Sequence, residues 1–140
     1  MIRRPIYLSR YDHHRLRALI ESIEALETAP SLDELRRELD RAIVVPGHVR
    51  MPTSVVTIDS RVTFEDLDSG IVTEMTPALP ENADPSRGAV SILDPVATAL
   101  LGYTQGDAPE VNDGGRVRRL RILRVLQSPV AEAAARLVVA

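Results

Sequence analysis

Cysteine is absent from this 140-residue chain, which excludes disulfide bridges and thiolate metal sites within it. Tryptophan is absent too, and aromatic residues make up 3% of the chain, too few for a platform on which nucleic-acid bases could stack. No apolar run approaches the roughly 20 residues of a membrane-spanning helix, and the N-terminal residues lack the apolar core of a signal peptide. We therefore expect a cytoplasmic protein without membrane contact.

Lysine is missing as well, so all 17 basic residues are arginine, and 20 acidic residues bring the formal net charge to −3. A general nucleic-acid binder usually carries a basic excess on one face, so sequence-specific binding of nucleic acid is not expected. A chain of this length buries about 68–70% of its unfolded surface, which suffices for a core without metal or disulfide support.

Two amphipathic stretches follow one another near the N-terminus. Ser9 predicts the start of a first helix, with Asp12 as its reciprocal partner in a capping box, and apolar residues then recur at helical spacing. After a break at residues 28–30, Ser31 and Glu34 predict a second capping box and a second helix. Because the break is short, we expect an antiparallel helical hairpin, with helices roughly 27 and 20 Å long.

Residues 46–52, with two prolines and a glycine, form the clearest linker. We place a domain boundary there, which separates a helical hairpin over residues 1–47 from a second domain over residues 48–140. Beyond the linker the period of the apolar residues changes from 3.6 to 2. One face of a strand is expected to carry Val56, Ile58, Val62 and Phe64.

The remaining pattern predicts further strands at residues 71–79, 90–92, 108–111 and 116–126. The strand at 108–111 contains a proline and is expected at an edge, and Asn112-Asp113-Gly114-Gly115 predicts a tight turn after it. The apolar positions of the last strand change phase, which indicates a β-bulge. The fold class is α+β, a helical hairpin followed by an antiparallel sheet with one short helix.

That short helix follows the strand at 90–92. Asp94 is placed to be its N-cap, and Pro95 suits the first helical position, where a missing N–H costs nothing. Leu100 and Leu101 give the helix an apolar side, and Gly102 can adopt the left-handed conformation that ends it.

No enzyme motif is found. Asp33 and Glu34 at the predicted hairpin tip could help to hold a divalent ion, but helix capping accounts for both their identity and their spacing, so we favour capping. His13 and His14 would point about 100° apart on a helix, and His48 lies in the linker. Without a catalytic triad, a nucleophile elbow or a phosphate-binding loop, we expect no enzyme and no cofactor.

Arginines dominate the last predicted strand. They are Arg116, Arg118, Arg119, Arg121 and Arg124. Alternate members would project to one face as a basic stripe that suits an acidic protein or phosphates. A solvated strand that discourages edge pairing is an equally good interpretation, and the sequence leaves both open.

An ordered set of short motifs runs through the chain. It consists of Glu38-Leu39-Asp40-Arg41-Ala42; Met51-Pro52, Val55-Val56-Thr57 and Ser60-Arg61-Val62; Pro95, Ala99-Leu100-Leu101-Gly102 and Gly106-Asp107; and Gly114-Gly115. In this order and spacing, over residues 5–128, the set resembles the Rnk family, regulators named after nucleoside diphosphate kinase and related to the Gre transcript-cleavage factors.

The resemblance implies that the second half adopts the FKBP-like fold of the Gre C-terminal domain and binds RNA polymerase at the rim of its secondary channel. In Gre factors, the loop ahead of the short helix grips a coiled coil of the polymerase, and the matching positions here are Leu93, Asp94 and Pro95. Pro95 agrees with the Gre pattern. Gre factors often have an acidic residue at the position of Leu93, whereas here the acid is Asp94.

The resemblance also bears on cleavage. Gre factors carry acidic residues at the tip of a much longer coiled coil that recruit magnesium for RNA cleavage, and Asp33 and Glu34 are the nearest equivalents here. A hairpin of roughly 20–27 Å should stop short of the catalytic centre, so we expect a competitor of Gre factors that does not stimulate cleavage. The alternatives are direct regulation of nucleoside diphosphate kinase, suggested by the family name, and an FKBP-like prolyl isomerase, which would need an aromatic-rich pocket.

Overall fold

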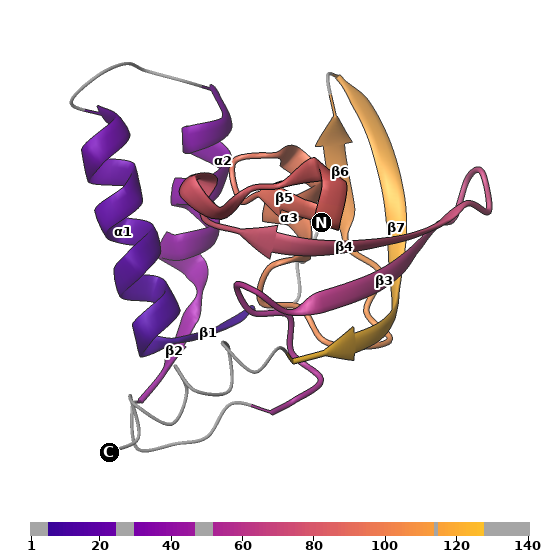
Figure 1. Cartoon of the computed structure of the whole chain (residues 1–140), viewed down its shortest axis with the longest axis horizontal. Coiled ribbons are helices and arrows are strands. Elements are labelled where there is room, and N and C mark those ends of the chain that lie inside the picture. Colours follow the sequence, from indigo (N-terminus) through magenta and orange to yellow (C-terminus); the bar gives the residue numbers. More distant parts are fainter. Residues whose placement is uncertain (1–5, 25–29, 47–51, 114, 128–140) are drawn as a thin grey trace.

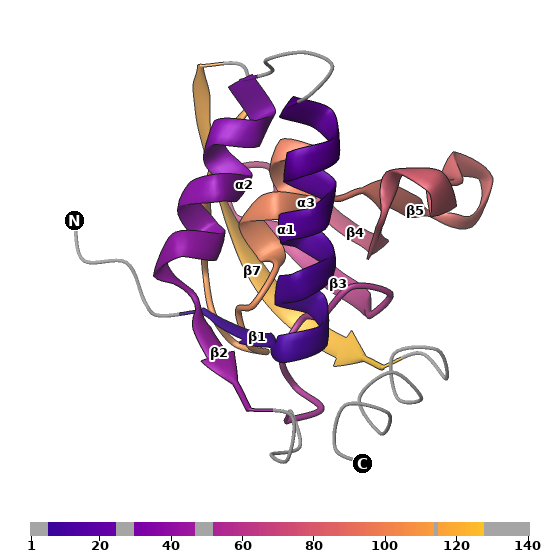
Figure 2. The same cartoon turned by 90° about the vertical axis from the view of Figure 1, so that its left-hand side faces the viewer.

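The computed structural model describes residues 6–24, 30–46, 52–113 and 115–127, and within them the chain combines helices with a curled sheet, an α+β arrangement. Helices α1 (Arg10–Glu24) and α2 (Pro30–Arg41) lie side by side, run in opposite directions and cover one flank of the sheet (Figure 1). The short helix α3 (Pro95–Leu100) packs between α2 and the sheet (Figure 2). None of the described helices is long and apolar enough to cross a membrane.

The main sheet has five strands in the described part of the chain. They are β3 (Arg61–Asp66), β4 (Val72–Ala78), β5 (Ala89–Ser91), β6 (Glu110–Asp113) and β7 (Arg116–Leu126), in the order β5-β4-β3-β7-β6. The register between β3 and β7 shifts beside Phe64, so the expected β-bulge in the last strand is confirmed. Strand β5 runs parallel to β4 rather than antiparallel as expected, because two 3₁₀ turns, η1 (Pro80–Asn82) and η2 (Pro85–Arg87), carry the chain back beside β4.

A second, smaller sheet joins the ends of the helical segment. Strands β1 (Tyr7–Ser9) and β2 (Ile43–Val45) pair in parallel, one just before α1 and the other just after α2. The Tyr7 amide donates to the Gly102 carbonyl at 3.0 Å, which ties this small sheet to the segment after α3. Neither strand is predicted by the sequence pattern.

The prediction of a strand around Val56 and Ile58 is wrong. Asp59 has φ +73°, a left-handed conformation that interrupts extended structure, and the regular strand begins afterwards at Arg61. Val56 and Ile58 are nevertheless buried, in an irregular segment whose Val56 amide donates to the Tyr103 carbonyl at 2.8 Å. The expected alternation therefore holds within β3 alone, where Val62 and Phe64 share the buried face.

The core is continuous between the helices and the sheet. A buried apolar cluster takes side chains from α1, α2 and α3 as well as from the main sheet. Among its members are Leu16, Ile20, Leu35, Leu39, Phe64, Leu100, Leu101, Leu120 and Ile122. The helical part and the sheet therefore pack against a common interior.

The domain boundary expected near residue 48 falls at residues 47–51, which lie outside the described residues. The division into a hairpin over residues 1–47 and a second domain over residues 48–140 therefore stays a prediction.

Candidate functional site

The turn ahead of α3 is built by short-range hydrogen bonds. Asp94 is the N-cap, as expected, and its Oδ1 accepts from the Val96 amide at 2.9 Å, while Pro95 occupies the first helical position. Ser91, which no sequence pattern singled out, accepts the Leu93 amide on its Oγ at 3.2 Å and the Asp94 amide on its carbonyl at 2.9 Å. Leu93, Asp94 and Pro95 are partly exposed, so the turn is a locally fixed feature at the surface.

Helix α3 supports this turn from behind. Thr98 is buried, its amide donates to the Asp94 carbonyl at 3.0 Å, and its hydroxyl donates to the Ile92 carbonyl at 2.6 Å. Leu100 and Leu101 are fully buried, as the sequence pattern predicts. A rigid turn with one carboxylate and neighbouring apolar groups offers shape and a hydrogen-bond acceptor, which suits recognition of a partner.

Gly102 ends α3 and meets two other segments. It has the expected left-handed φ, +82°, and its amide donates to the Val56 carbonyl at 2.9 Å. A Cβ at this position would lie 2.7 Å from the Ile6 Cβ, closer than real side chains approach. The end of α3, which supports the turn, is therefore in direct contact with Ile6 and Tyr7, just before α1.

The candidate acids at the hairpin tip lie apart from this turn. Asp33 is exposed and pairs with Arg36 at 2.9 Å, and the side chain of Glu34 is outside the described residues. Helix α2 begins at Pro30, one residue before the expected cap Ser31. His13 Nε2 lies 3.3 Å from the Leu39 carbonyl, and His48 is not among the described residues. Over the described ranges, no group of three or more His, Asp or Glu side chains could hold a metal ion.

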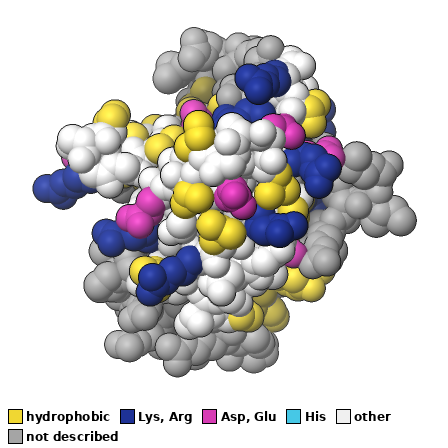
Figure 3. Space-filling view, turned by 90° about the vertical axis from the view of Figure 1, so that its right-hand side faces the viewer, with side chains coloured by type: hydrophobic (Ala, Val, Ile, Leu, Met, Phe, Trp, Pro, Cys, Tyr) yellow, Lys and Arg dark blue, Asp and Glu magenta, His cyan; other side chains and the backbone are white. Residues whose placement is uncertain are grey.

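The arginines of β7 divide between the two faces of the sheet. Arg119 and Arg121 lie on the outer face, where the strand register sets them opposite Glu110 of β6 and Glu65 of β3. Arg118 is on the other face with Arg116, and its Nε is 3.0 Å from Asp66 Oδ2. On the side of the molecule shown in Figure 3, arginine, acidic and apolar side chains are interspersed. Acidic neighbours therefore offset part of the positive charge of the arginines in the basic stripe.

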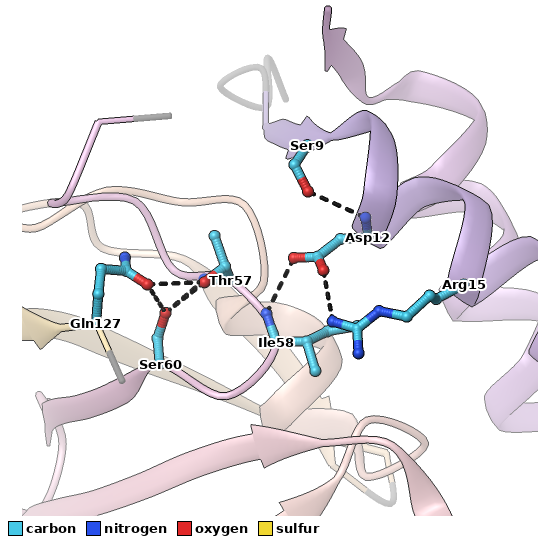
Figure 4. A network of polar contacts seen from close by, with 7 residues as sticks. All are labelled: Ser9, Asp12, Arg15, Thr57, Ile58, Ser60 and Gln127. Atoms are coloured by element: carbon cyan, nitrogen blue, oxygen red, sulfur yellow. Dashed lines mark hydrogen bonds and ion pairs between the residues drawn. The ribbon is translucent and has the colours of Figure 1, made fainter. Parts of the chain in front are cut away.

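Asp12 has a different role from the one expected. Ser9 does cap α1, because its Oγ accepts the Asp12 amide at 3.0 Å, but the Asp12 carboxylate points toward the sheet side (Figure 4). Its Oδ2 accepts the Ile58 amide at 3.2 Å, and its Oδ1 accepts from Arg15 at 2.7 Å. Burial raises the pKa of Asp12 above its ordinary value, although Arg15 acts in the opposite direction. The capping-box role is thus replaced by a tertiary contact.

Comparisons with known proteins agree with this architecture. The family described as "Transcription elongation factor, GreA/GreB, C-term" matches residues 51–127, and the family described as "Rnk N-terminus" matches residues 4–45. A relative named regulator of nucleoside diphosphate kinase, from Escherichia coli (strain K12), is 35% identical over 132 residues, which are 94% of this chain and 96% of that protein.

The sequence match to a GreA factor covers a shorter part of this chain, whereas the match to a solved Gre-factor structure covers most of it. A transcription elongation factor GreA from Desulfovibrio desulfuricans is 45% identical over 56 residues, 40% of this chain and 35% of that protein. A solved structure described as a prokaryotic transcription elongation factor GreA/GreB from Nitrosomonas europaea is 39% identical, with a TM-score of 0.67. The match covers 89% of this chain and 99% of that one.

Proposed function

Because this chain belongs to the Rnk family and carries a Gre-type C-terminal part, we propose that it is a transcription regulator that binds RNA polymerase. It occupies the rim of the secondary channel, in the cytoplasm, and competes there with Gre-type factors without stimulating transcript cleavage. The observation that carries this proposal is the match of the Gre C-terminal family over residues 51–127, which contain the supported turn ahead of α3.

We assign the polymerase contact to Leu93, Asp94 and Pro95. The turn is held by Ser91 and by α3, so it needs little ordering when a partner binds. Asp94 Oδ1 accepts the Val96 amide, and an ionised carboxylate has further acceptor sites. Asp94 can therefore cap α3 and accept a hydrogen bond from the polymerase at the same time.

The lengths of the helices support a regulator that does not stimulate cleavage. Helices α1 and α2 have 15 and 12 residues in the described part, which correspond to about 22 and 18 Å. We propose that they form a short antiparallel coiled-coil hairpin and that residues 48–140 form an FKBP-like domain of the Gre C-terminal type. Asp33, already paired with Arg36, then stays distant from the polymerase catalytic centre.

The test is competition with a Gre factor for purified RNA polymerase, combined with a transcript-cleavage assay on stalled complexes. Asp94→Ala and Pro95→Ala are expected to weaken competition by about tenfold, a change of about 1.4 kcal/mol in binding. The chain offers a matched control in Asp84-Pro85, because Asp84 also precedes a proline and caps a short helix by accepting the Ser86 amide at 3.1 Å. Asp84→Ala and Pro85→Ala should compete like the unmodified chain.

A different experimental result would contradict each part of the proposal. Competition by Asp94→Ala and Pro95→Ala at wild-type strength would overturn the assignment of the site. Efficient cleavage by this protein alone would overturn the competitor role, and absence of polymerase binding would overturn the whole proposal.

Direct regulation of nucleoside diphosphate kinase is the second candidate, favoured by the name of the Escherichia coli relative. A pull-down scored for polymerase subunits against the kinase separates the two candidates. We do not propose prolyl isomerase activity. Two of the described aromatic side chains have other contacts, since Tyr11 stacks with Arg15 and the Tyr103 hydroxyl accepts from Arg41 at 2.8 Å.

A further inference from the structure

Two pairs of a buried acid and a partly exposed arginine lie at the same end of the α1–α2 pair. Asp12 and Arg15 are near the beginning of α1, whereas Glu38 and Arg41 are near the end of α2, and the two helices run in opposite directions (Figure 1). Each acid is paired with an arginine three residues later, at 2.7 and 2.8 Å, and the side chains of both acids are 5% exposed.

The first pair contacts the segment ahead of β3. Asp12 Oδ2 accepts the Ile58 amide at 3.2 Å (Figure 4). That amide is itself held in place, because the adjoining Asp59 amide donates to the Pro77 carbonyl of β4 at 2.7 Å. Arg15, which holds the other oxygen of Asp12, stacks on Tyr11 with its guanidinium 4.3 Å from the ring centroid.

The second pair contacts the segment after α3. Arg41 Nε donates to Glu38 at 3.0 Å, and an Arg41 terminal nitrogen donates to the Tyr103 hydroxyl at 2.8 Å. Tyr103 and the segment contacted by the first pair are also joined, because the Val56 amide donates to the Tyr103 carbonyl at 2.8 Å. Both pairs therefore hold the same junction of the sheet side from two helices.

Buried ion pairs contribute little net stability compared with apolar residues of similar volume. Apolar packing is non-directional, whereas a carboxylate that accepts one particular amide and a guanidinium that meets one particular hydroxyl fix an orientation. We propose that Asp12–Arg15 and Glu38–Arg41 are positioning residues that set the orientation of α1 and α2 against the sheet. This inference goes beyond the proposed function and does not depend on polymerase binding.

The test is a distance measurement between spin labels in the free, full-length protein. The chain has no cysteine, so Ala18→Cys on α1 and Arg124→Cys on β7, both exposed, place the labels without further changes. The labelled protein should give a narrow distance distribution. Adding Asp12→Ala and Tyr103→Phe together should broaden this distribution and shift its maximum, because both directional contacts are lost.

Asp33→Ala is the matched control. Asp33 also lies in the first turn of its helix and also pairs with an arginine three residues later, but its side chain is 58% exposed. The control should leave the distribution unchanged. An unchanged distribution in the folded double variant, or equal broadening in the control, would overturn the proposal.

Tyr103→Phe alone keeps the test decisive where the double variant fails to fold. It removes a single hydroxyl and retains the ring that packs in the core. Circular dichroism establishes that this variant is folded, and its distance distribution should be broader than that of the unmodified protein. A distribution of unchanged width would contradict the role of the second pair.

Discussion

Gly102 occupies a position that no residue with a side chain fits. Its φ is +82°, and an added Cβ would lie 2.7 Å from Ile6 Cβ and 3.2 Å from the Tyr7 carbonyl oxygen. Gly102→Ala is therefore expected to lower the free energy of unfolding by about 3 kcal/mol, since backbone strain and overpacking act together. Urea unfolding followed by circular dichroism measures the loss.

Gly106 is the control for that substitution. Its φ is +95°, but an added Cβ would meet nothing within 4 Å. Gly106→Ala should cost about 1 kcal/mol, the strain of the left-handed backbone without the collision. Equal losses at the two positions would contradict the close approach of Ile6 to Gly102.

The buried Asp12 carboxyl makes stability depend on pH. Because burial raises its folded-state pKa above the ordinary value of 3.8, the folded protein holds this proton more tightly than the unfolded chain. The stability that Asp12 contributes is present below pH 3.8 and is lost as the pH rises through the raised value. Asp12→Asn should reduce that decline in a series of urea titrations, although Asp59, whose pKa burial also raises, retains part of it.

Asp66 provides a comparison, because its pKa is shifted in the direction opposite to that of Asp12. Amides of Asp68 and Ser69 donate to its carboxylate, with Arg118 beside it, and these contacts lower its pKa. Its contribution is present above pH 3.8 and is lost as the pH falls through the lowered value. Asp66→Asn should therefore flatten the acid side of the profile. The same change of slope in both variants would contradict the assigned directions.

For individual residues, the sequence predicts contacts with close neighbours well and contacts with distant parts of the chain poorly. Ser9, Asp94, Pro95 and Gly102 have the capping or terminating roles that their types and spacing indicate. The sequence assigns Asp12 to a capping box because that pattern concerns four consecutive residues. Its actual acceptor role toward Ile58 joins positions 46 residues apart, and no local pattern contains that distance.

Among the larger elements, strand β7 is fixed at its end by Gln127. The Oε1 of Gln127 lies 2.9 Å from the hydroxyls of Thr57 and Ser60 (Figure 4). Its Nε2 donates to the Val55 carbonyl at 2.8 Å. Gln127→Ala should lower the free energy of unfolding by about 2 kcal/mol, because buried polar groups lose their partners. Thermal and urea unfolding both report this loss.

Gln105→Ala serves as its control. Gln105 is exposed and accepts one amide, that of Val125, at 3.2 Å. Its loss should cost about 1 kcal/mol or less. If Gln127→Ala were no more costly than Gln105→Ala, the buried network would have no special part in holding β7.

The elements also differ in how far sequence predicts them. Strand β7 and its bulge are predictable because 11 residues carry enough alternation to reveal both the strand and the change of phase. Strands β1 and β2 have three residues each, too few for a period to appear. Their pairing depends on the helices between them, which bring residues 7–9 beside residues 43–45.

Considered as a whole, the molecule has a core shared by the helical part and the sheet. We therefore expect α1 and α2 to open together with β3 and β7 rather than separately. Native-state hydrogen exchange, followed by mass spectrometry of peptides from these elements, should give similar free energies of opening. A markedly lower value for the helical peptides would show that the helices unfold on their own.

At the candidate site, the sequence predicts the local structure of the turn but not the partner that it binds. The cap Asp94, Pro95 and helix α3 follow from the sequence because each depends on close neighbours. The partner of Leu93, Asp94 and Pro95 stays a prediction, since it depends on a surface outside this chain.

The position of the two acid–arginine pairs has a mechanical consequence. They lie at one end of α1 and α2. A rotation of the helix pair relative to the sheet would therefore turn about the contacts with Ile58 and Tyr103. Over a helix about 22 Å long, a rotation of about 10° about these contacts displaces the far end by about 4 Å. The contacts at this end therefore act together with the shared core in setting where the far end lies, and sequence changes there can displace the far end without altering any of its residues.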